Sequence, residues 1–306
     1  MLRRWLKSTY KDVGTDSTTA VLLSSGRSGS TWLGSSIHAV PGTRMIFEPF
    51  HPKHGLERLV ARRYRFVDPE ANDAQLKSAF ADLFSGIDRC EWCDQFNSAL
   101  TFTYKRRLLK EVRINLLLPW LAANFPAFKY ILLLRHPAAV VLSQLRGGWK
   151  LSARRLLTQL PQEEAAVLQR LDNMGWPDEG FESNMIFWAV ENRIALRAAM
   201  EAGALVIFYE DLCVDPAAEL NRVQQYLDCK IPDAALSTID KPSWSSQSSV
   251  ADLSLEQKVA GWQQRISARQ QSMMLEILEI CEMADTYGID PFPLKSRVDG
   301  SVDRLS

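Results

Sequence analysis

The chain has 306 residues, 46% of them hydrophobic, so it can bury a sizeable core in one large or two small domains. Lysine plus arginine and aspartate plus glutamate both number 36, and the resulting zero net charge argues against wholesale binding of nucleic acid. No apolar run reaches the roughly 18 residues that a membrane-spanning helix needs, so we expect no such helix.

The first predicted element is a buried strand at residues 20–24, followed by a small-residue loop and a helix at 30–39. Gly26 and Gly29 let the chain bend, so that backbone N–H groups of the loop and of the helix N-terminus converge on one point. Arg27 adds a cation to this loop, and hydroxyl donors come from Ser28, Ser30 and Thr31. The pattern predicts a site for a phosphate or sulfate group.

This loop differs from the common nucleotide-triphosphate loop, in which a lysine directly precedes the hydroxyl residue. Here Gly29 is followed at once by Ser30 and Thr31, and the cation lies earlier, at Arg27. The sequence therefore disfavours ATP hydrolysis.

The next stretch predicts a short strand at 44–47 that leads into Glu48, and then a charged mixture of helices and loops over residues 53–105. A short strand at 110–112 and a helix at 113–124, interrupted near Pro119, follow. The basic runs at 53–65 and 105–113 fit either attraction of an anionic cofactor or acceptor, or solvated helix faces.

A second anion motif follows the predicted strand at 129–135. The strand ends at Arg135, and Pro137 suits the first turn of a helix at 138–145 that carries Ser143. Ligands of open α/β sheets bind at the carboxyl ends of the strands. Two strand ends that each carry an arginine and hydroxyl groups predict a ligand with two separated anionic groups.

The rest of the chain continues the alternation of helices and strands. The predicted elements are irregular or helical structure at 146–183, a helix at 185–200, a strand at 204–209, a helix at 216–227, a Ser- and Pro-rich loop at 240–252 and largely helical structure at 253–287. Such alternation predicts an α/β fold with a mostly parallel central sheet flanked by helices.

With these two motifs, the chain resembles the sulfotransferases that use 3′-phosphoadenosine-5′-phosphosulfate (PAPS). The segment Arg27-Ser28-Gly29-Ser30-Thr31-Trp32 resembles the family loop that cradles the 5′-phosphosulfate, and Arg135 with Ser143 resembles the pair that grips the 3′-phosphate. The stretch at 205–212 resembles the family's later strand and its Tyr-Glu-Asp end. The resemblance covers residues 20–290 and implies the P-loop nucleotide-hydrolase-like sulfotransferase fold.

The resemblance also implies the reaction: in-line transfer of the sulfuryl group of PAPS to an acceptor hydroxyl, with release of PAP. It assigns Arg27 to the leaving oxygen and places the loop from Gly26 onward around the cofactor. Trp32 either stacks on the adenine or packs in the core. Lys258, in a segment that faintly resembles the late cofactor-covering loop, is a candidate third cofactor contact.

A general base must take the proton of the acceptor hydroxyl. In the family this base is a glutamate or a histidine, and Glu48 is our first candidate, with His51 and His54 as rivals. We expect the flanking phenylalanines and prolines to raise the pKa of Glu48 by desolvation. The segment around Glu48 resembles that of carbohydrate-modifying members, which favours a carbohydrate or glycolipid acceptor. His136 is expected to pack.

We predict a polar lead-in at 1–19, one domain at 20–290 and a tail at 291–306, with segments 50–110 and 146–183 binding the acceptor. The expected partners are a small-molecule or glycan hydroxyl acceptor and no nucleic acid. The simpler location is cytoplasmic, although the stripe within 1–7 allows weak contact with a membrane surface. Two alternatives stay open: a nucleotide-dependent kinase or phosphotransferase, and a non-catalytic PAP- or PAPS-binding protein.

The five cysteines are odd in number and mostly irregular in spacing, which argues against a disulfide framework. Cys90-Glu91-Trp92-Cys93 is a single C-x-x-C with neither a second pair nor a histidine adjacent to it. We interpret it as a buried or incidental pair, and we predict no metal site.

Overall fold

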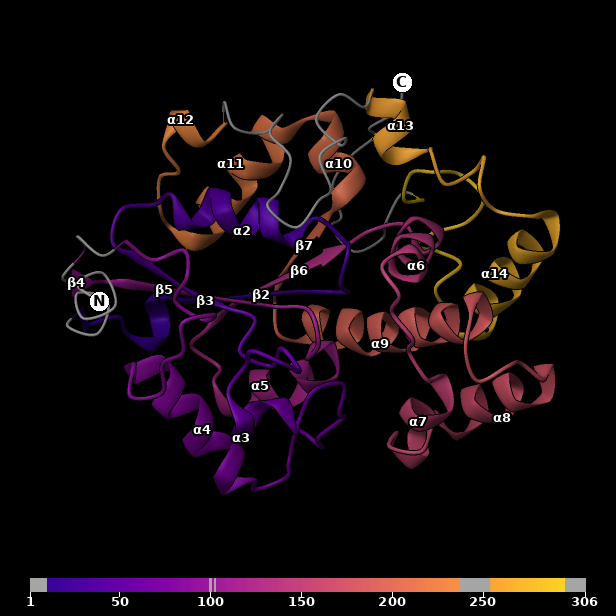
Figure 1. The fold of residues 1–306 in the computed structure, drawn as a ribbon, viewed down its shortest axis with the longest axis horizontal. Coiled ribbons are helices and arrows are strands. Elements are labelled where there is room, and N and C mark those ends of the chain that lie inside the picture. Colours follow the sequence, from indigo (N-terminus) through magenta and orange to yellow (C-terminus); the bar gives the residue numbers. More distant parts are fainter. Residues whose placement is uncertain (1–9, 99–100, 102, 237–253, 295–306) are drawn as a thin grey trace.

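The computed structural model describes residues 10–98, 101, 103–236 and 254–294, and its centre is a parallel sheet of five strands (Figure 1). The strands lie in the order β3-β5-β2-β6-β7, and every neighbouring pair is parallel. Their bounds are Thr19–Ser24 for β2, Thr43–Phe47 for β3, Arg106–Glu111 for β5, Lys129–Leu134 for β6 and Leu205–Phe208 for β7. Beside it, β1 (Lys11–Asp12) pairs with β4 (Thr103–Tyr104).

Helices cover both faces of the sheet (Figure 1). The longer ones are α2 (Ser30–His38), α4 (Ala74–Ser85), α6 (Pro137–Arg146), α8 (Ala165–Met174), α9 (Phe181–Glu201), α11 (Pro216–Leu227) and α14 (Ala268–Ile280). The shorter ones are α3 (Glu57–Val60), α5 (Leu118–Asn124), α7 (Ala153–Leu157), α10 (Tyr209–Val214), α12 (Asp233–Leu236) and α13 (Leu255–Val259), with 3-10 turns at Asp16–Thr18, Asn115–Leu117 and Gln162–Glu164.

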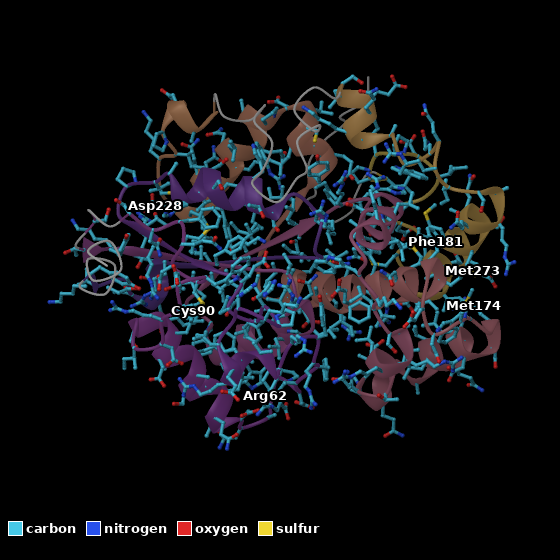
Figure 2. All side chains as sticks on the ribbon, in the orientation of Figure 1. Arg62, Cys90, Met174, Phe181, Asp228 and Met273 are labelled. Carbon is cyan, nitrogen blue, oxygen red and sulfur yellow. A yellow bond between two sulfur atoms is a disulfide. The ribbon has the colours of Figure 1, made fainter. Side chains whose placement is uncertain are left out.

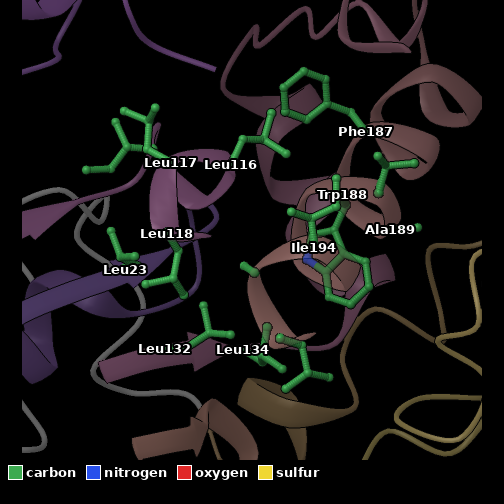
Figure 3. Close-up of a cluster of buried hydrophobic side chains, with 14 of the residues drawn as sticks. Leu23, Leu116, Leu117, Leu118, Leu132, Leu134, Phe187, Trp188, Ala189 and Ile194 are labelled. Atoms are coloured by element: carbon green, nitrogen blue, oxygen red, sulfur yellow. The ribbon is translucent and has the colours of Figure 1, made fainter. Parts of the chain in front are cut away.

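The alternation of side chains along β2 explains the two layers. Val21 and Leu23 join the large core against α5 and α9, part of which is drawn in Figure 3, whereas Ala20 and Leu22 join the core against α2 and α11. Side chains of a strand point alternately to the two faces of a sheet. An apolar strand with both faces buried is typical of a parallel sheet covered by helices.

The predicted strands at 20–24, 44–47 and 129–135 are confirmed to within about one residue, as are the helices at 30–39 and 216–227. The predicted short strand at 110–112 is wrong in extent, because β5 begins at Arg106. Its charged residues are tolerated because Arg107 Nε pairs with Asp12 at 2.9 Å and Lys110 pairs with Glu48. The basic run at 105–113 is therefore part of the sheet and not a solvated helix face.

Two other predictions need correction. Tyr209 begins the short helix α10 and does not end the preceding strand. Of the predicted helical stretch at 253–287, the described residues 254–287 hold only α13 and α14, with turns between them. The predicted loop at 240–252 and the terminal stripe at 1–7 lie outside the described residues. Within the residues that the structure describes, no helix is both long and apolar enough to cross a membrane.

The cysteine pair of the C-x-x-C segment is joined in the structure. Cys90, labelled in Figure 2, forms a disulfide with Cys93, whereas the sequence analysis interpreted this segment as a buried or incidental pair. The count and spacing of the cysteines bear on a framework of several bridges, whereas this bridge closes one turn between residues three positions apart.

Candidate active site

The carboxyl ends of the five parallel strands bring the candidate residues to one edge of the sheet. The chain leaves β2 into the small-residue loop, β3 into Glu48, β6 into Arg135 and β7 into Tyr209. Arg113 follows two residues after β5. These positions are spread from residue 25 to residue 209, and the parallel order of the strands brings them together.

The loop between β2 and α2 has a conformation that its glycines permit. Gly29, the N-cap residue of α2, has φ +88°, and a Cβ there would lie 2.6 Å from the ring of Tyr209. A Cβ on Gly26 would lie 2.4 Å from the ring of Trp149. Arg27 itself has φ +80°, a region that non-glycine residues rarely adopt. Strained backbone of this kind is concentrated at functional sites.

The loop offers donors to an anion. The first N–H groups of α2 have no acceptor within the helix, and the helix dipole adds positive potential at this end. Ser28 is 1% exposed, and among the described residues its Oγ has no hydrogen-bond partner. A buried hydroxyl without a partner is unfavourable in the free protein, and a bound oxyanion would satisfy it.

The arginines of the two predicted motifs meet directly. Arg27 Nε donates to Ser143 Oγ at 3.1 Å, and Arg135 Nη1 donates to the carbonyl oxygen of Arg27 at 2.9 Å. Burial lowers the pKa of Arg27, and the positive charges of Arg135 and Arg146 lower that pKa further. Bound negative charge beside Arg27 would offset this repulsion and would therefore be stabilising.

The surroundings of Arg135 include Tyr209 and the segment that contains Lys258. Its guanidinium lies 4.1 Å from the centre of the Tyr209 ring, and its Nη2 donates to the carbonyl oxygen of Lys258 at 3.2 Å. The structure thus brings α13, the segment of the predicted late loop, to the second motif. Trp32 is half-buried and packs partly against the core beneath α2.

Glu48 is held between two cations. Its carboxylate forms ion pairs with Lys110 Nζ and with Arg113 Nη1, the latter at 2.8 Å. Burial alone would raise the pKa of this carboxyl, but Lys110 and Arg113 outweigh burial and lower the pKa to about 2. The expectation of a raised pKa is therefore wrong. It failed because Lys110 lies opposite Phe47 across the β3–β5 pair, a register that the sequence does not display.

Glu48 is connected to the anion loop through Arg113 and Trp149. The Arg113 guanidinium lies 5.5 Å from the centre of the Trp149 ring, and the same ring packs against Gly26. A chain of contacts therefore links Glu48 to the anion loop at this edge of the sheet.

The histidines divide as follows. His51 Nδ1 accepts the N–H groups of Lys53 and His54 at 3.3 and 3.2 Å, so in the neutral ring the proton is on Nε2. Burial, with repulsion from Arg113, lowers the pKa of His51 to about 4. In the free protein both candidate bases are therefore engaged, His51 through Nδ1 and Glu48 through both of its carboxylate oxygens. His136 packs as expected: its ring stacks on that of Trp262, with the two ring centres 4.1 Å apart.

A buried glutamate supports the loop from below, and sequence reasoning missed it. Ser25 Oγ donates to Glu191 Oε1 at 2.6 Å, and Asn192 Nδ2 donates to Ser25 Oγ at 2.8 Å. Burial raises the pKa of Glu191 to about 8. A local signal was present, because Glu191, Asn192 and Arg193 interrupt an otherwise apolar helical run from 185 to 196.

A model described as the sulfotransferase family matches residues 20–233, from β2 to the beginning of α12. The chain belongs to the sulfotransferase family. The matched range contains both anion motifs of this sulfotransferase, its Glu48 and its Tyr209. Lys258 lies beyond it.

Several solved sulfotransferases are similar to this one over most of its length. The sulfotransferase domain of the Synechococcus PCC 7002 olefin synthase is 20% identical, covers 86% of this chain and 93% of its own, and has a TM-score of 0.45. The sulfotransferase domain from the curacin biosynthetic pathway is 18% identical, covers 85% of this chain and 95% of its own, and has a TM-score of 0.46. Mouse sulfotransferase SULT7A1 complexed with PAP is 15% identical, covers 93% and 89%, and scores 0.44. No curated protein matches the chain.

Proposed function

We propose that this sulfotransferase transfers the sulfuryl group of PAPS to an acceptor hydroxyl and releases PAP. The observation that carries the proposal is the convergence of the two arginine motifs on adjacent strands. Arg27 contacts Ser143 at 3.1 Å, and Arg135 contacts the Arg27 carbonyl at 2.9 Å. This arrangement suits a ligand with two anionic groups, because each strand end supplies a guanidinium and a hydroxyl.

The residues present fit such a ligand. In the proposal, the loop N–H groups and the unpartnered Ser28 hydroxyl hold the 5′-phosphosulfate. Arg135 and Ser143 hold the 3′-phosphate, and Lys258 contributes from α13. PAPS supplies an activated sulfuryl group whose bond to the phosphate oxygen breaks as a bond to the acceptor oxygen forms. Arg27 stabilises the negative charge that develops on the leaving phosphate oxygen.

Glu48 is the proposed acceptor of the hydroxyl proton. Its low pKa keeps it ionised at neutral pH, but Lys110 and Arg113 occupy its oxygens in the free protein. An effective base has a pKa nearer the operating pH. We therefore propose that the acceptor hydroxyl displaces one of these cations from Glu48, which raises the basicity of the carboxylate when the acceptor is in place.

The proposed acceptor is a carbohydrate or glycolipid hydroxyl, on the strength of the carboxylate base at Glu48. The test incubates the protein with PAPS and a panel of sugar, glycolipid and phenol acceptors, and measures PAP and sulfated product by chromatography. We expect product with at least one sugar-bearing acceptor, and we expect Glu48→Gln to reduce kcat/KM about 10²- to 10⁴-fold.

The exposed Glu57 on α3 provides the matched control, because Glu57→Gln leaves the site untouched. Equal rates for the wild type and Glu48→Gln would remove Glu48 from its role. Turnover of ATP with magnesium, without use of PAPS, would replace the proposal by a phosphotransferase.

A further inference from the structure

The Cys90–Cys93 disulfide lies outside the anion site and has no part in the proposed chemistry. A bridge between residues three positions apart closes a very short loop, so it restricts the unfolded chain little and contributes little stability by that route. Cys90 is partly exposed, whereas Cys93 is fully buried. Accessible disulfides are the ones that exchange with thiols, whereas enclosed ones are structural.

The segment from Cys93 to Asn97 is bonded to the outer edge of β3, the edge strand of the sheet. The Cys93 carbonyl accepts the N–H of Phe47 at 2.9 Å. The Asn97 side chain accepts the Met45 N–H at 2.8 Å and donates to the Met45 carbonyl at 2.9 Å. These bonds fasten the segment that contains one cysteine to the residue directly before Glu48.

The residue between the cysteines reaches the segment that follows Glu48. The Trp92 ring lies 4.7 Å from the ring of His51, 5.0 Å from that of His54 and 5.4 Å from that of Phe47. Cys90 Sγ lies 3.6 Å from the His54 carbonyl oxygen. The disulfide turn therefore contacts the chain on both sides of Glu48 in sequence. It contacts Phe47 before Glu48, and His51 and His54 after it.

We propose that Cys90 and Cys93 form a thiol–disulfide exchange site whose redox state sets the mobility of the Phe47–His54 segment. A small-molecule thiolate attacks Cys90 Sγ, and Cys93 leaves as a thiolate and takes up a proton. A second thiol then attacks the mixed disulfide and releases Cys90. In sum, the protein disulfide is reduced to two thiols and two small thiols are oxidised to one disulfide. The link from this segment to acceptor binding rests on the proposed function.

Reduction removes the covalent constraint on the turn that carries Trp92 and gives Cys90 a hydrogen that it can donate to the His54 carbonyl. The full chain is equilibrated in glutathione buffers of graded redox poise, quenched by alkylation and analysed by peptide mass spectrometry. We expect the peptide that contains Cys90 and Cys93 to change from no alkylated cysteine to two within the range of redox poise that these glutathione buffers cover. Reduction only by a strong phosphine would mark a structural disulfide and overturn the proposal, as would free thiols in every buffer.

Hydrogen–deuterium exchange of the two forms tests the coupling without PAPS or an acceptor. On reduction, we expect amides of residues 45–56 to exchange at least about fivefold faster, the low end of couplings between sites, and those of residues 26–33 to stay unchanged. Cys90→Ser should reproduce the reduced pattern and lose the response. Cys229→Ser, which removes a free cysteine and leaves the pair intact, should behave as the wild type. An unchanged 45–56 segment after full reduction would disprove the coupling.

Thermal stability with PAP, measured in both redox states, keeps the two proposals apart. If PAP stabilises the protein in both states but segment 45–56 does not respond, the exchange-site coupling fails and the proposed function stands. If the segment responds but PAP stabilises neither state, the exchange site stands and the proposed cofactor fails.

Discussion

A terminal nitrogen of Arg135 donates a hydrogen bond to the carbonyl oxygen of Arg27 at 2.9 Å. The two residues are 108 positions apart in sequence and follow the adjacent strands β2 and β6. Arg135 thereby holds the backbone of the loop at Arg27, and the side chain of Arg27 in turn donates to Ser143. The two anion motifs form one connected site, so a change in either motif should weaken binding of the whole ligand.

Replacing Arg135 should therefore weaken the binding of PAP more than the loss of one exposed charge would. A hydrogen bond to a charged group contributes about 1.5–3 kcal/mol, so Arg135→Ala should weaken PAP binding about 10- to 150-fold. Calorimetric titration measures the dissociation constant. Arg106→Ala is the control. Arg106 also donates to two carbonyl oxygens, those of Leu227 and Asp228, but it is the first residue of β5 and so lies at the amino ends of the strands, away from the anion site. Equal losses in both variants would refute a specific role for Arg135.

The loop conformation should be intolerant of a side chain at Gly29. An alanine there has both an unfavourable φ and a Cβ 2.6 Å from the Tyr209 ring, so Gly29→Ala should lose measurable PAP binding. Gly203→Ala separates strain from contact, because Gly203 has φ +62° with no atom within 4 Å of a Cβ. That variant should lose about 1–2 kcal/mol of stability and bind PAP as the wild type does. Normal binding by Gly29→Ala would show that the loop does not hold the ligand.

Glu191 should make the protein less stable as the pH rises. Its folded pKa is raised from 4.5 to about 8, so between these values the folded state holds a proton that the unfolded state has lost. The free energy of unfolding should then fall by up to about 1.4 kcal/mol per pH unit across that window. Glu191→Gln mimics the protonated form and should flatten this slope in denaturant unfolding measured from pH 5 to 8. A wild-type slope unchanged in the variant would contradict the raised pKa.

Glu48 should show the opposite dependence. Its folded pKa is lowered from 4.5 to about 2, so its contribution to stability is complete above about 4.5 and is lost as the pH falls toward 2. Glu48→Gln should remove this acid-side loss, and Lys110→Met should reduce it, because Arg113 then holds the carboxylate alone. The free energy of unfolding from pH 5 to 3 provides the measurement. Identical acid slopes in the wild type and Glu48→Gln would show that the carboxyl is not held by the cations.

Much of the site could be predicted because its motifs are local in sequence. The loop from Gly26 to Trp32, and Arg135 with Ser143, each lie within one strand–turn–helix unit, where periodicity and turn residues carry the information. The parallel order of the strands then follows from the alternation of elements, and the predicted α/β fold is confirmed.

What could not be predicted depends on pairings between distant segments. The low pKa of Glu48 requires the register that places Lys110 opposite Phe47, and the approach of Tyr209 to Gly29 requires β7 to follow β6 in the sheet. The polar interruption at Glu191 is visible in the sequence, but its contact with Ser25, 166 residues away, is not. Such contacts arise from tertiary packing, and local pattern carries no record of them.

The most direct test of the central claim is the thermal stability of the protein with PAP, with ATP and magnesium as the comparison. A ligand at 100 times its dissociation constant adds about 2.7 kcal/mol to the folded state, which is a readable rise in Tm. Our account predicts that PAP raises the Tm, that ATP with magnesium does not, and that Arg135→Ala reduces the rise at the same PAP concentration. No rise with PAP, or an equal rise with ATP and magnesium, would contradict it.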